Sequence, residues 1–318
     1  MKTPSYVSAP RSTNPTIGYL FAVLNAVVSG IAIYVNSLGV KLFSDSTLYT
    51  TLKNAVVGVA LLVPVVALAR CRAELRGLNA RQWGWLLLLA LIGGSVPYLL
   101  FFRGLQLTTP VTSSLLNHAQ FLLVALLALV FLRERVGLLV WGALAVLFVG
   151  VSLGANFHTL RWNEGTLLVA LSSLLFAAGV VLAKHLLRDL STETVMAAKM
   201  TLGSVFLLGY VAATGRLGAI GSLSTRQWTF VVVTGLILLA FSVTAFVALR
   251  HITATAATAI PVASPLITTA LVAVGSGALT LRTMDVVGLL VMSVAAAAII
   301  IAGWRREARA GAGKVAVA

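Results

Sequence analysis

Long stretches without a charged residue constrain this chain more than any other feature of its sequence. Eight of them, each of at least 19 residues, contain no Asp, Glu, Lys or Arg: 12–40, 82–102, 104–132, 136–160, 165–183, 227–249, 251–281 and 286–304. Because about 20 apolar residues form a helix that crosses the hydrocarbon core of a bilayer, each stretch predicts one transmembrane helix. Two further stretches, 46–69 and 194–215, are each interrupted by one lysine, Lys53 or Lys199. The sequence therefore predicts an all-α membrane protein with ten transmembrane helices.

The composition agrees with a membrane protein. Hydrophobic residues make up 59% of the 318 positions and charged residues only 10%, which is too little polar surface for a soluble fold. The net charge of +15 would suggest nucleic-acid binding in a soluble chain. Here the charges must lie at the membrane edges, so we expect the lipid bilayer and a small-molecule substrate as partners, and no nucleic acid.

Several classes of chemistry are excluded by what the sequence lacks. Its one cysteine, Cys71, cannot form a disulfide framework or a cysteine-based metal site. No phosphate-binding G-x-x-x-x-G-K-[ST] motif is present, so ATP is not expected to drive the protein. No spacing pairs a nucleophile with a base. We therefore expect no catalytic residues, no cofactor, no metal and no enzyme activity.

The distribution of basic residues predicts the orientation in the membrane, because short cytoplasmic loops are rich in Lys and Arg. With ten helices and a cytoplasmic N-terminus, 15 of the 23 Lys and Arg residues fall on the cytoplasmic side, 6 on the other side and 2 within helices. We therefore expect a multi-pass protein of the bacterial inner (plasma) membrane with both termini in the cytoplasm.

Short matches indicate that the chain repeats itself at a spacing of about 145 residues. Arg81-Gln-Trp recurs as Arg226-Gln-Trp, Gly18-Tyr-Leu recurs as Gly165-Thr-Leu, and the Ser-Thr pair at 46–47 recurs at 191–192. Five helices per repeat is an odd number, so the second repeat must enter the membrane from the opposite side. We expect a polar N-terminal segment at 1–15, a first five-helix repeat at 16–154, a connecting loop at 155–164, a second repeat at 165–304 and a basic tail at 305–318. Inverted repeats are typical of alternating-access transporters.

The segment from Leu132 to Gly142 resembles a known family. It is a short basic loop with Glu134 that runs into a Gly-rich helix, and it resembles the end of the EamA-type repeat of the drug/metabolite transporter superfamily. Pro265, in Pro-Val-Ala-Ser-Pro, resembles the proline in that repeat's fourth helix. The resemblance covers the whole chain, and bacterial aromatic amino acid exporters are the members that it suggests. It implies that helices 1–4 and 6–9 surround a central cavity, with helices 5 and 10 outside it.

The chain departs from the pattern of this family at several positions. Thr280 stands where the second repeat would carry the glutamate, and Gln120 stands where the first repeat would carry the proline. These departures leave the substrate open within the superfamily.

Two lysines within predicted helices are candidate substrate-binding residues. Lys53 and Lys199 occupy matching positions of the second and seventh helices. An ionisable side chain inside a bilayer is costly, so each lysine needs a partner or a function. One interpretation is structural, because a long cationic stem can reach the headgroups or cap a helix end. The other is that the cation holds a substrate carboxylate.

His118 and Asn117, on the fourth predicted helix, are two further candidates. His118 is the most central titratable group, and it is interpreted either as a structural donor or as a substrate contact or proton site. Asn117 shares a helix face with Gln120, roughly 100° away from His118. Only one of these faces can point squarely into a cavity.

Asn25 and Tyr98 complete the set of candidate substrate-binding residues. Asn25 belongs to a polar stripe along the first helix, which is interpreted either as a cavity wall or as close helix packing. Tyr98 follows Pro97 and the glycines at 93 and 94, where we expect the third helix to bend.

These features favour a transporter that exports small hydrophobic metabolites by alternating access. Aromatic or hydrophobic neutral amino acids are the expected substrates, because an apolar wall with Tyr98 suits the side chain and a lysine or an amide suits the zwitterionic end. No predicted helix contains an internal carboxylate, so we expect no tight ion coupling. The alternatives are an exporter of other amphipathic metabolites or drugs and, in a different class, a membrane-embedded enzyme or a channel.

Overall fold

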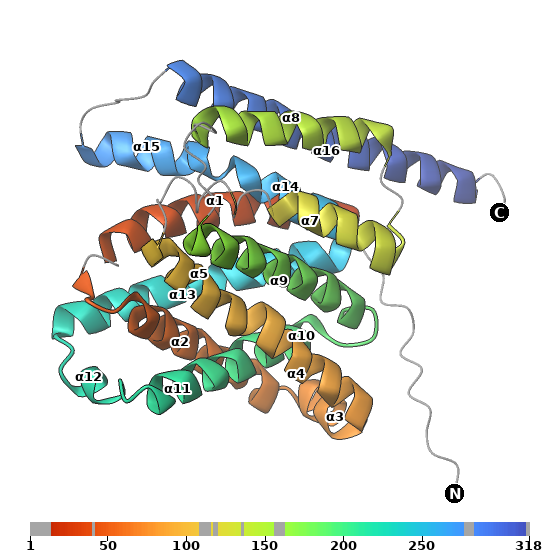
Figure 1. The fold of residues 1–318 in the computed structure, drawn as a ribbon. Helices are drawn as coiled ribbons and strands as arrows, with labels where there is room; N and C mark the ends of the chain where they lie inside the picture. Colours follow the sequence, from red (N-terminus) through yellow and green to blue (C-terminus); the bar gives the residue numbers. More distant parts are fainter. Residues whose placement is uncertain are drawn as a thin grey trace, which may run out of the picture.

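The computed structural model of the chain describes residues 14–39, 42–107, 116, 120–134, 137–155, 163–276 and 283–315. Within these ranges every regular element is a helix (Figure 1). The first half contains α1 (Pro15–Gly39), α2 (Ser46–Ala67), α3 (Ala69–Gly77), α4 (Ala80–Gly94), α5 (Val96–Leu107), α7 (Gln120–Leu127), the π-helix η2 (Ala128–Leu132) and α8 (Leu138–Ala155). The second half contains α9 (Glu164–Leu186), α10 (Thr192–Ala197), the π-helix η4 (Ala198–Leu202), α11 (Gly203–Ala213), α12 (Gly218–Gly221), α13 (Thr225–His251), α14 (Ala254–Ala259), the 3₁₀ helix η5 (Ile260–Ala263), α15 (Pro265–Ser276) and α16 (Thr283–Val315).

Eight segments of the described chain are long and apolar enough to cross a membrane. They are Pro15–Asn36, Ser46–Ala67, Ala80–Gly104, Glu164–Leu186, Thr192–Ala213, Thr225–His251, Ala254–Val272 and Val286–Gly303. Two shorter apolar helices, Gln120–Leu132 and Leu138–Ser152, accompany them. The all-helical prediction is therefore confirmed for the described residues, and eight of the ten predicted spans are found there.

Exposed aliphatic side chains cover the outside of these helices. On α2, Val59, Val63 and Val66 are each more than 60% exposed. Their spacing of three or four residues places them on one face of the helix. A soluble fold would bury such a stripe, whereas the hydrocarbon of a bilayer can surround it.

The repeated Arg-Gln-Trp motif marks the start of a helix in each half. α4 begins with a capping box, in which Asn79 Oδ1 accepts a hydrogen bond from Gln82 N (2.9 Å) and Gln82 Oε1 accepts one from Asn79 N (3.0 Å). α13 begins with the same arrangement between Ser224 and Gln227. A capping box satisfies two backbone N–H groups that the helix cannot satisfy itself. The motif therefore fixes a helix N-terminus at a matching place in both halves.

The helices lie in layers (Figure 1). α8 and α16 lie side by side along one edge of the bundle, and α2 packs against η4 and α11 along the opposite edge. Between these edges α1 packs on α13, and α5 packs on α9. Each of these contacts joins one half of the chain to the other, and both of the buried apolar clusters contain residues of both halves.

Helix ends meet at two opposite ends of the bundle, called end A and end B. At end A, Asn14 N donates to His251 Nδ1 (2.9 Å) and Lys184 Nζ donates to Leu249 O (2.6 Å), so the start of α1 lies with the ends of α13 and α9. The matching helices α1 and α9 therefore run in opposite directions. At end B, Gln227 Nε2 donates to Leu42 O (2.8 Å). In Figure 1, α3 marks end A on the right and α12 marks end B on the left.

The glycines of the Gly18 and Gly165 repeat let matching helices approach closely. A Cβ atom on Gly18 would lie 2.5 Å from Ile252 Cγ2, and one on Gly165 would lie 2.7 Å from the carbonyl carbon of Leu107. Gly18 lies near the start of α1 and meets the residue after α13. Gly165 lies near the start of α9 and meets the last residue of α5. Any larger residue would force these helices apart.

The expected bend in the third span is confirmed. Ser95 separates α4 from α5, and its hydroxyl donates to Ala90 O (3.1 Å), one of the carbonyls near the end of α4. The span Ala254–Val272 is also broken, because the 3₁₀ helix η5 contains Pro261 and α15 begins at Pro265. Proline cannot donate a backbone hydrogen bond, which is why both breaks lie beside a proline.

A π-turn interrupts the helix that contains Lys199. η4 lies between α10 and α11, and its backbone bonds span five residues instead of four. The spacing between the halves changes here, because Ser46 and Ser191 are 145 residues apart while Lys53 and Lys199 are 146 apart. A π-turn accommodates one additional residue, so η4 absorbs an insertion in the second half.

Candidate functional site

Lys199 lies where η4 crosses α4, and glycines make this crossing close. A Cβ atom on Gly94 would lie 2.5 Å from Lys199 O, and one on Gly203 would lie 2.8 Å from Gly94 O. One on Gly93 would lie 3.5 Å from Lys199 Cε and 3.4 Å from Gly179 Cα. The end of the lysine stem therefore lies beside the close contact between α4 and α9, at the level of the apolar spans.

The Lys199 ammonium has an aromatic neighbour. Its Nζ lies 5.5 Å from the ring centroid of Phe246 on α13, a distance suited to a cation–π interaction. Among the described residues, Nζ has no hydrogen-bond acceptor and no carboxylate partner. A cation–π contact offsets only part of the cost of removing an ammonium from water. Within the described part of the chain, the Phe246 ring is therefore the partner that the structure gives this ammonium.

An aromatic pair lies close to Lys199. The rings of Tyr98 on α5 and Phe176 on α9 meet edge to face, with centroids 4.9 Å apart at an interplanar angle of 82°. Tyr98 comes five residues after Gly93, and Phe176 three residues before Gly179, which places the pair roughly 5–8 Å from the crossing along the helix axes. We call Lys199, Phe246, Tyr98 and Phe176 the Lys199 cluster.

Lys53, in contrast, has partners from its own half. Its Nζ donates to Asn36 Oδ1 on α1 (3.1 Å) and lies 5.2 Å from the ring centroid of Tyr49. The hydroxyl of Tyr49 donates to the same Asn36 oxygen (2.7 Å). Side chains of its own half thus hold the Lys53 ammonium in this conformation, and its role in substrate binding stays a prediction.

The two lysines do not come together. Lys53 O lies near Gly235, since a Cβ atom there would be 3.4 Å from it, while Lys199 Nζ lies over Phe246. Both neighbours are on α13, and eleven residues of helix correspond to about 16 Å. Each side chain also leans toward the start of its own helix, which is end B for Lys53 and end A for Lys199. One small substrate group cannot bind both ammonium groups at once.

Asn25 lies in the contact between α1 and α13. It is 2% exposed, and its Nδ2 donates to Phe241 O (2.9 Å) and Thr244 Oγ1 (2.8 Å). The matching residue of the second half, Ser172, donates to Pro97 O (2.8 Å) between α9 and α5. Interhelical bonding thus occupies the Asn25 amide in this conformation, and its role in substrate binding stays a prediction.

Two other candidates, His118 and Asn117, lie outside the described residues, and their roles stay predictions. Gln120, on the same predicted face as Asn117, begins α7 and is half-buried.

Sequence reasoning missed the aromatic residues that contact the two lysines. Tyr49 precedes Lys53 by one helical turn, and this spacing was a signal that could have identified it. Phe246 belongs to a distant part of the chain, and no local pattern points to it. Thr50 and Thr51 were also missed, and their hydroxyls are buried without a hydrogen-bond partner among the described residues.

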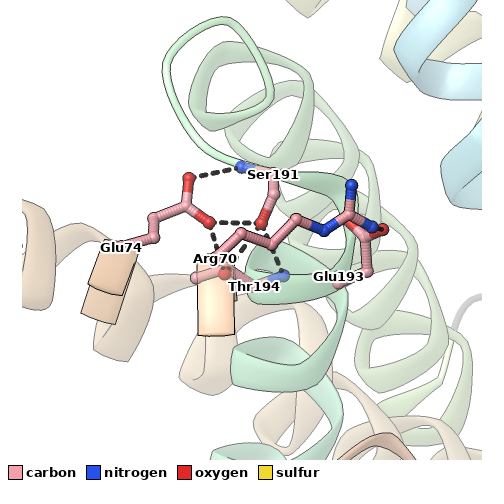
Figure 2. Close-up of polar contacts among 5 residues, drawn as sticks. All are labelled: Arg70, Glu74, Ser191, Glu193 and Thr194. Carbon is pink, nitrogen blue, oxygen red and sulfur yellow. Dashed lines mark hydrogen bonds and ion pairs between the residues drawn. The ribbon is translucent and has the colours of Figure 1, made fainter. Parts of the chain in front are cut away.

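Sequence reasoning also missed the structural role of two carboxylates at end A. Glu74, at the end of α3, accepts hydrogen bonds from Ser191 N (2.8 Å) and Thr194 Oγ1 (2.7 Å) at the start of α10 (Figure 2). Glu134 accepts one from Ala254 N (2.8 Å) at the start of α14. Each carboxylate thus binds the first turn of a helix in the other half of the chain.

Comparison with known proteins identifies the family. The EamA-like transporter family matches the chain twice, over residues 16–154 and 163–302. No curated protein matches the chain as a relative. One solved structure, described only as "Crystal structure of protein", has a TM-score of 0.67 and 17% sequence identity to this chain. The similarity covers 92% of this chain and 98% of that one, and at this identity it concerns the fold alone.

The two family matches span most of the chain, one in each half. They account for the paired capping boxes and the paired glycines, because both halves are copies of one repeat. Members of this family are membrane transporters of small molecules. With its eight candidate spans, this multi-pass membrane protein belongs to the EamA-like transporter family.

Proposed function

We propose that the protein exports aromatic or hydrophobic neutral amino acids by alternating access. One observation carries this proposal: the Lys199 ammonium has no carboxylate partner among the described residues, and its stem lies beside Gly93, roughly 5–8 Å along the helix axes from the Tyr98–Phe176 pair. A zwitterion with an apolar ring presents a carboxylate to Lys199 and an aromatic face to the pair. The separation of roughly 5–8 Å suits the length of such a molecule.

The chemistry of binding follows from the surroundings of Lys199. An ammonium that lies over Phe246 and beside Gly93 is poorly solvated, so a carboxylate that reaches it forms a strong charge-assisted hydrogen bond. The side chain of the substrate then contacts Tyr98 and Phe176, since edge-to-face pairs readily accept another ring. Three further residues remain proposed contacts of the substrate: Asn25, Asn117 and His118. Lys53 remains a proposed contact of the substrate carboxylate in another conformation.

The proposed membrane arrangement has ten helices in two inverted repeats, 16–154 and 165–304. The helices Gln120–Leu132 and Leu138–Ser152 would belong to two further spans, which brings the eight candidate spans to ten. The opposite directions of α1 and α9 support the inversion. We propose that end A faces the cytoplasm of a bacterial inner membrane, because basic residues are concentrated in the sequence segments at that end.

We propose that transport is facilitated diffusion or exchange without tight ion coupling. Within the described parts of the candidate spans, carboxylates occur only in the first turns, at Glu164 and Glu193. A proton-coupled carrier normally needs a titratable group deep in the membrane. His118 is the group that would supply it, and uphill accumulation under a pH gradient that vanishes in His118→Ala would contradict the uncoupled proposal.

Counterflow in proteoliposomes tests the substrate. Vesicles loaded with unlabelled phenylalanine should take up labelled phenylalanine saturably, and leucine and tryptophan should compete. Phenylalanine amide, which lacks the carboxylate, should compete poorly. Equal competition by phenylalanine and its amide would overturn the proposed role of Lys199.

Two lysine variants provide a matched comparison. Lys199→Met should lower the apparent affinity for phenylalanine about tenfold or more, the size expected when a charged hydrogen bond is lost. Lys53→Met should change this affinity little, because Asn36 and Tyr49 hold Lys53 in place. A larger loss of affinity in Lys53→Met than in Lys199→Met would contradict the proposed site and would show that the substrate binds nearer to Lys53, toward end B.

Reporter fusions test the arrangement in the membrane. Fusions after Arg76 and Arg188 should read cytoplasmic, and fusions after Arg161 and Arg226 periplasmic. A periplasmic signal at Arg188 would contradict the inverted repeats, since both halves would then enter from the same side.

A further inference from the structure

Glu74 makes a three-way contact with the start of α10 (Figure 2). One carboxylate oxygen accepts the backbone N–H of Ser191, and the other accepts the hydroxyls of Ser191 and Thr194. Ser191 is the N-cap of α10, and it is buried. A carboxylate is favoured there because the N-terminus of a helix carries a partial positive charge. Glu74 therefore binds α3 of the first repeat to α10 of the second.

Glu134 makes an equivalent contact with the start of α14. Its Oε1 accepts the backbone N–H of Ala254 (2.8 Å), and its Oε2 accepts the hydroxyl of Thr255 (3.2 Å). The backbone just before this carboxylate has an uncommon conformation, because Arg133 is left-handed with φ 54°. Glu134 thus binds the end of η2, in the first repeat, to the second repeat.

The second repeat presents a connected platform to these two carboxylates. Lys184 Nζ donates to Leu249 O (2.6 Å) and Ile252 O (2.6 Å), which ties the end of α9 to the residues just before α14. Arg250 Nη1 donates to Leu190 O (2.9 Å), just before α10. Hydrogen bonds therefore connect the segments just before α10 and α14, and the two glutamates bind the same connected part of the second repeat.

End B lacks glutamates at the matching sequence positions. At the spacing of 146 that relates Arg70 to Arg216, Glu74 corresponds to Ile220, and Thr280 stands where the family pattern would place the second glutamate. Neither residue carries a charge that could bind a helix N-terminus. Among the described residues, these two carboxylate contacts are found at end A only.

We propose that Glu74 and Glu134 are the two latches of a single gate that holds end A closed, and that both must release when end A opens. This inference rests on alternating access, which belongs to the proposed function. It assigns the two glutamates as positioning residues that act through α10 and α14, without contact to the substrate. The gate closes because each latch satisfies helix N–H groups that the opening of end A would expose.

The only cysteine of the chain is a natural reporter for this gate. Cys71 lies on α3, between Arg70 and Glu74, and it is fully buried. Burial raises the pKa of its thiol, and the nearby charge of Glu193 raises it further. α3 packs against α10. Opening of end A should separate these helices and expose the thiol.

The test measures the rate at which N-ethylmaleimide labels Cys71 in the purified full-length protein in lipid nanodiscs, followed by intact mass. Glu134→Gln is the decisive variant, because Glu134 is not among the charges that act on Cys71, so a faster reaction must come from opening. Glu74→Gln and Glu134→Gln should each raise the rate about tenfold, the factor that corresponds to about 1.4 kcal/mol. The matched control is Asp45→Asn at end B, which should leave the rate within about twofold of the wild type, since Asp45 caps α2 and forms an exposed ion pair with Arg216 at the end far from Cys71.

A wild-type labelling rate in Glu134→Gln would overturn the proposal, as would an equal rise in Asp45→Asn. If a glutamine variant does not fold, Thr194→Val and Thr255→Val remove one donor to each latch and keep the carboxylate. Each should raise the rate by about threefold in protein with an unchanged unfolding temperature, and no rise in either would also overturn the gate. Labelling needs no substrate, so this result is independent of whether amino acids are transported.

Discussion

End A and end B share one contact between the repeats and differ in the others. At end A, Arg70 pairs with Glu193 (2.7 Å), and at end B, Arg216 pairs with Asp45 (3.1 Å). Arg70 and Arg216 occupy matching positions, so the duplication explains both pairs. Both are substantially exposed to solvent and contribute little to stability.

The contacts that differ involve buried or half-buried charges. At end A, Glu74, Glu134 and Lys184 bind backbone groups at the ends of helices. At end B, Gln227 binds the carbonyl of Leu42 through a neutral amide. A duplicated scaffold can open at either end equally well. The comparison indicates that the described contacts of the two ends differ mainly in charges that only one copy of the repeat carries.

The largest expected effect comes from the paired glycines near the two ends. Gly165→Ala, at end B, should destabilise the protein by about 3 kcal/mol, because its Cβ would meet the backbone of Leu107 and overpacking costs this much. Gly18→Ala, at end A, should cost less, because its nearest clash is with the Ile252 side chain, which can move. Unfolding temperatures in detergent measure both, and a greater loss in Gly18→Ala would show that end A is the more rigid.

A smaller effect is expected for Lys184, whose matching sequence position in the first half is the uncharged Ser37. Lys184→Met leaves the carbonyls of Leu249 and Ile252 without their donor, and the loss of charged hydrogen bonds should cost about 2 kcal/mol. The same variant should also speed the labelling of Cys71, because the platform that the latches bind is loosened. An unchanged unfolding temperature would show that the platform does not depend on this lysine.

Arg133 offers a change in the opposite direction. Its left-handed backbone costs roughly 1 kcal/mol for a residue with a side chain, so Arg133→Gly should stabilise the protein by about that amount. Glu134 should stay bound, and the labelling of Cys71 should not become faster. A drop in unfolding temperature would show that the Arg133 side chain contributes more than the backbone costs.

The smallest effects are expected for the ion pairs that both ends share. Arg70→Gln and Arg216→Gln should each change the stability by less than about 1 kcal/mol, as is usual for exposed pairs. The two changes should also be similar in size. A large effect in only one of them would contradict the view that these pairs are equivalent.

Much of the fold could be predicted from the sequence, because bilayer thickness and the cost of buried charge leave few choices for stretches such as 227–249 and 165–183. The repeat was also visible, since the capping residues Gln82 and Gln227 must recur where helices start. Eight candidate spans are found among the described residues, and the count of ten stays a prediction.

The candidate site could be predicted only in part. Lys199 and Tyr98 were identified because charge in a span and a ring beside a bend are local signals. Phe246 and Phe176 were not, since their proximity depends on how distant helices cross. Glu74 lies in an Arg-rich segment and looks like an ordinary surface charge. Its role depends on the loop before α10, which is more than a hundred residues away.

The π-turn at Lys199 bears on how the two halves diverged. One residue inserted into an uninterrupted α-helix rotates all that follows by about 100°. Such a rotation would turn Lys199 away from Phe246 and break the bond from Thr201 Oγ1 to Gly58 O (2.9 Å), or else detach Thr194 from Glu74. η4 confines the extra residue to Ala198–Leu202, so both ends of the helix keep their original faces. The second half thus tolerated a change in length that ordinarily destroys a duplicated structure, and deletion of one residue should be tolerated within η4 but not elsewhere in this helix.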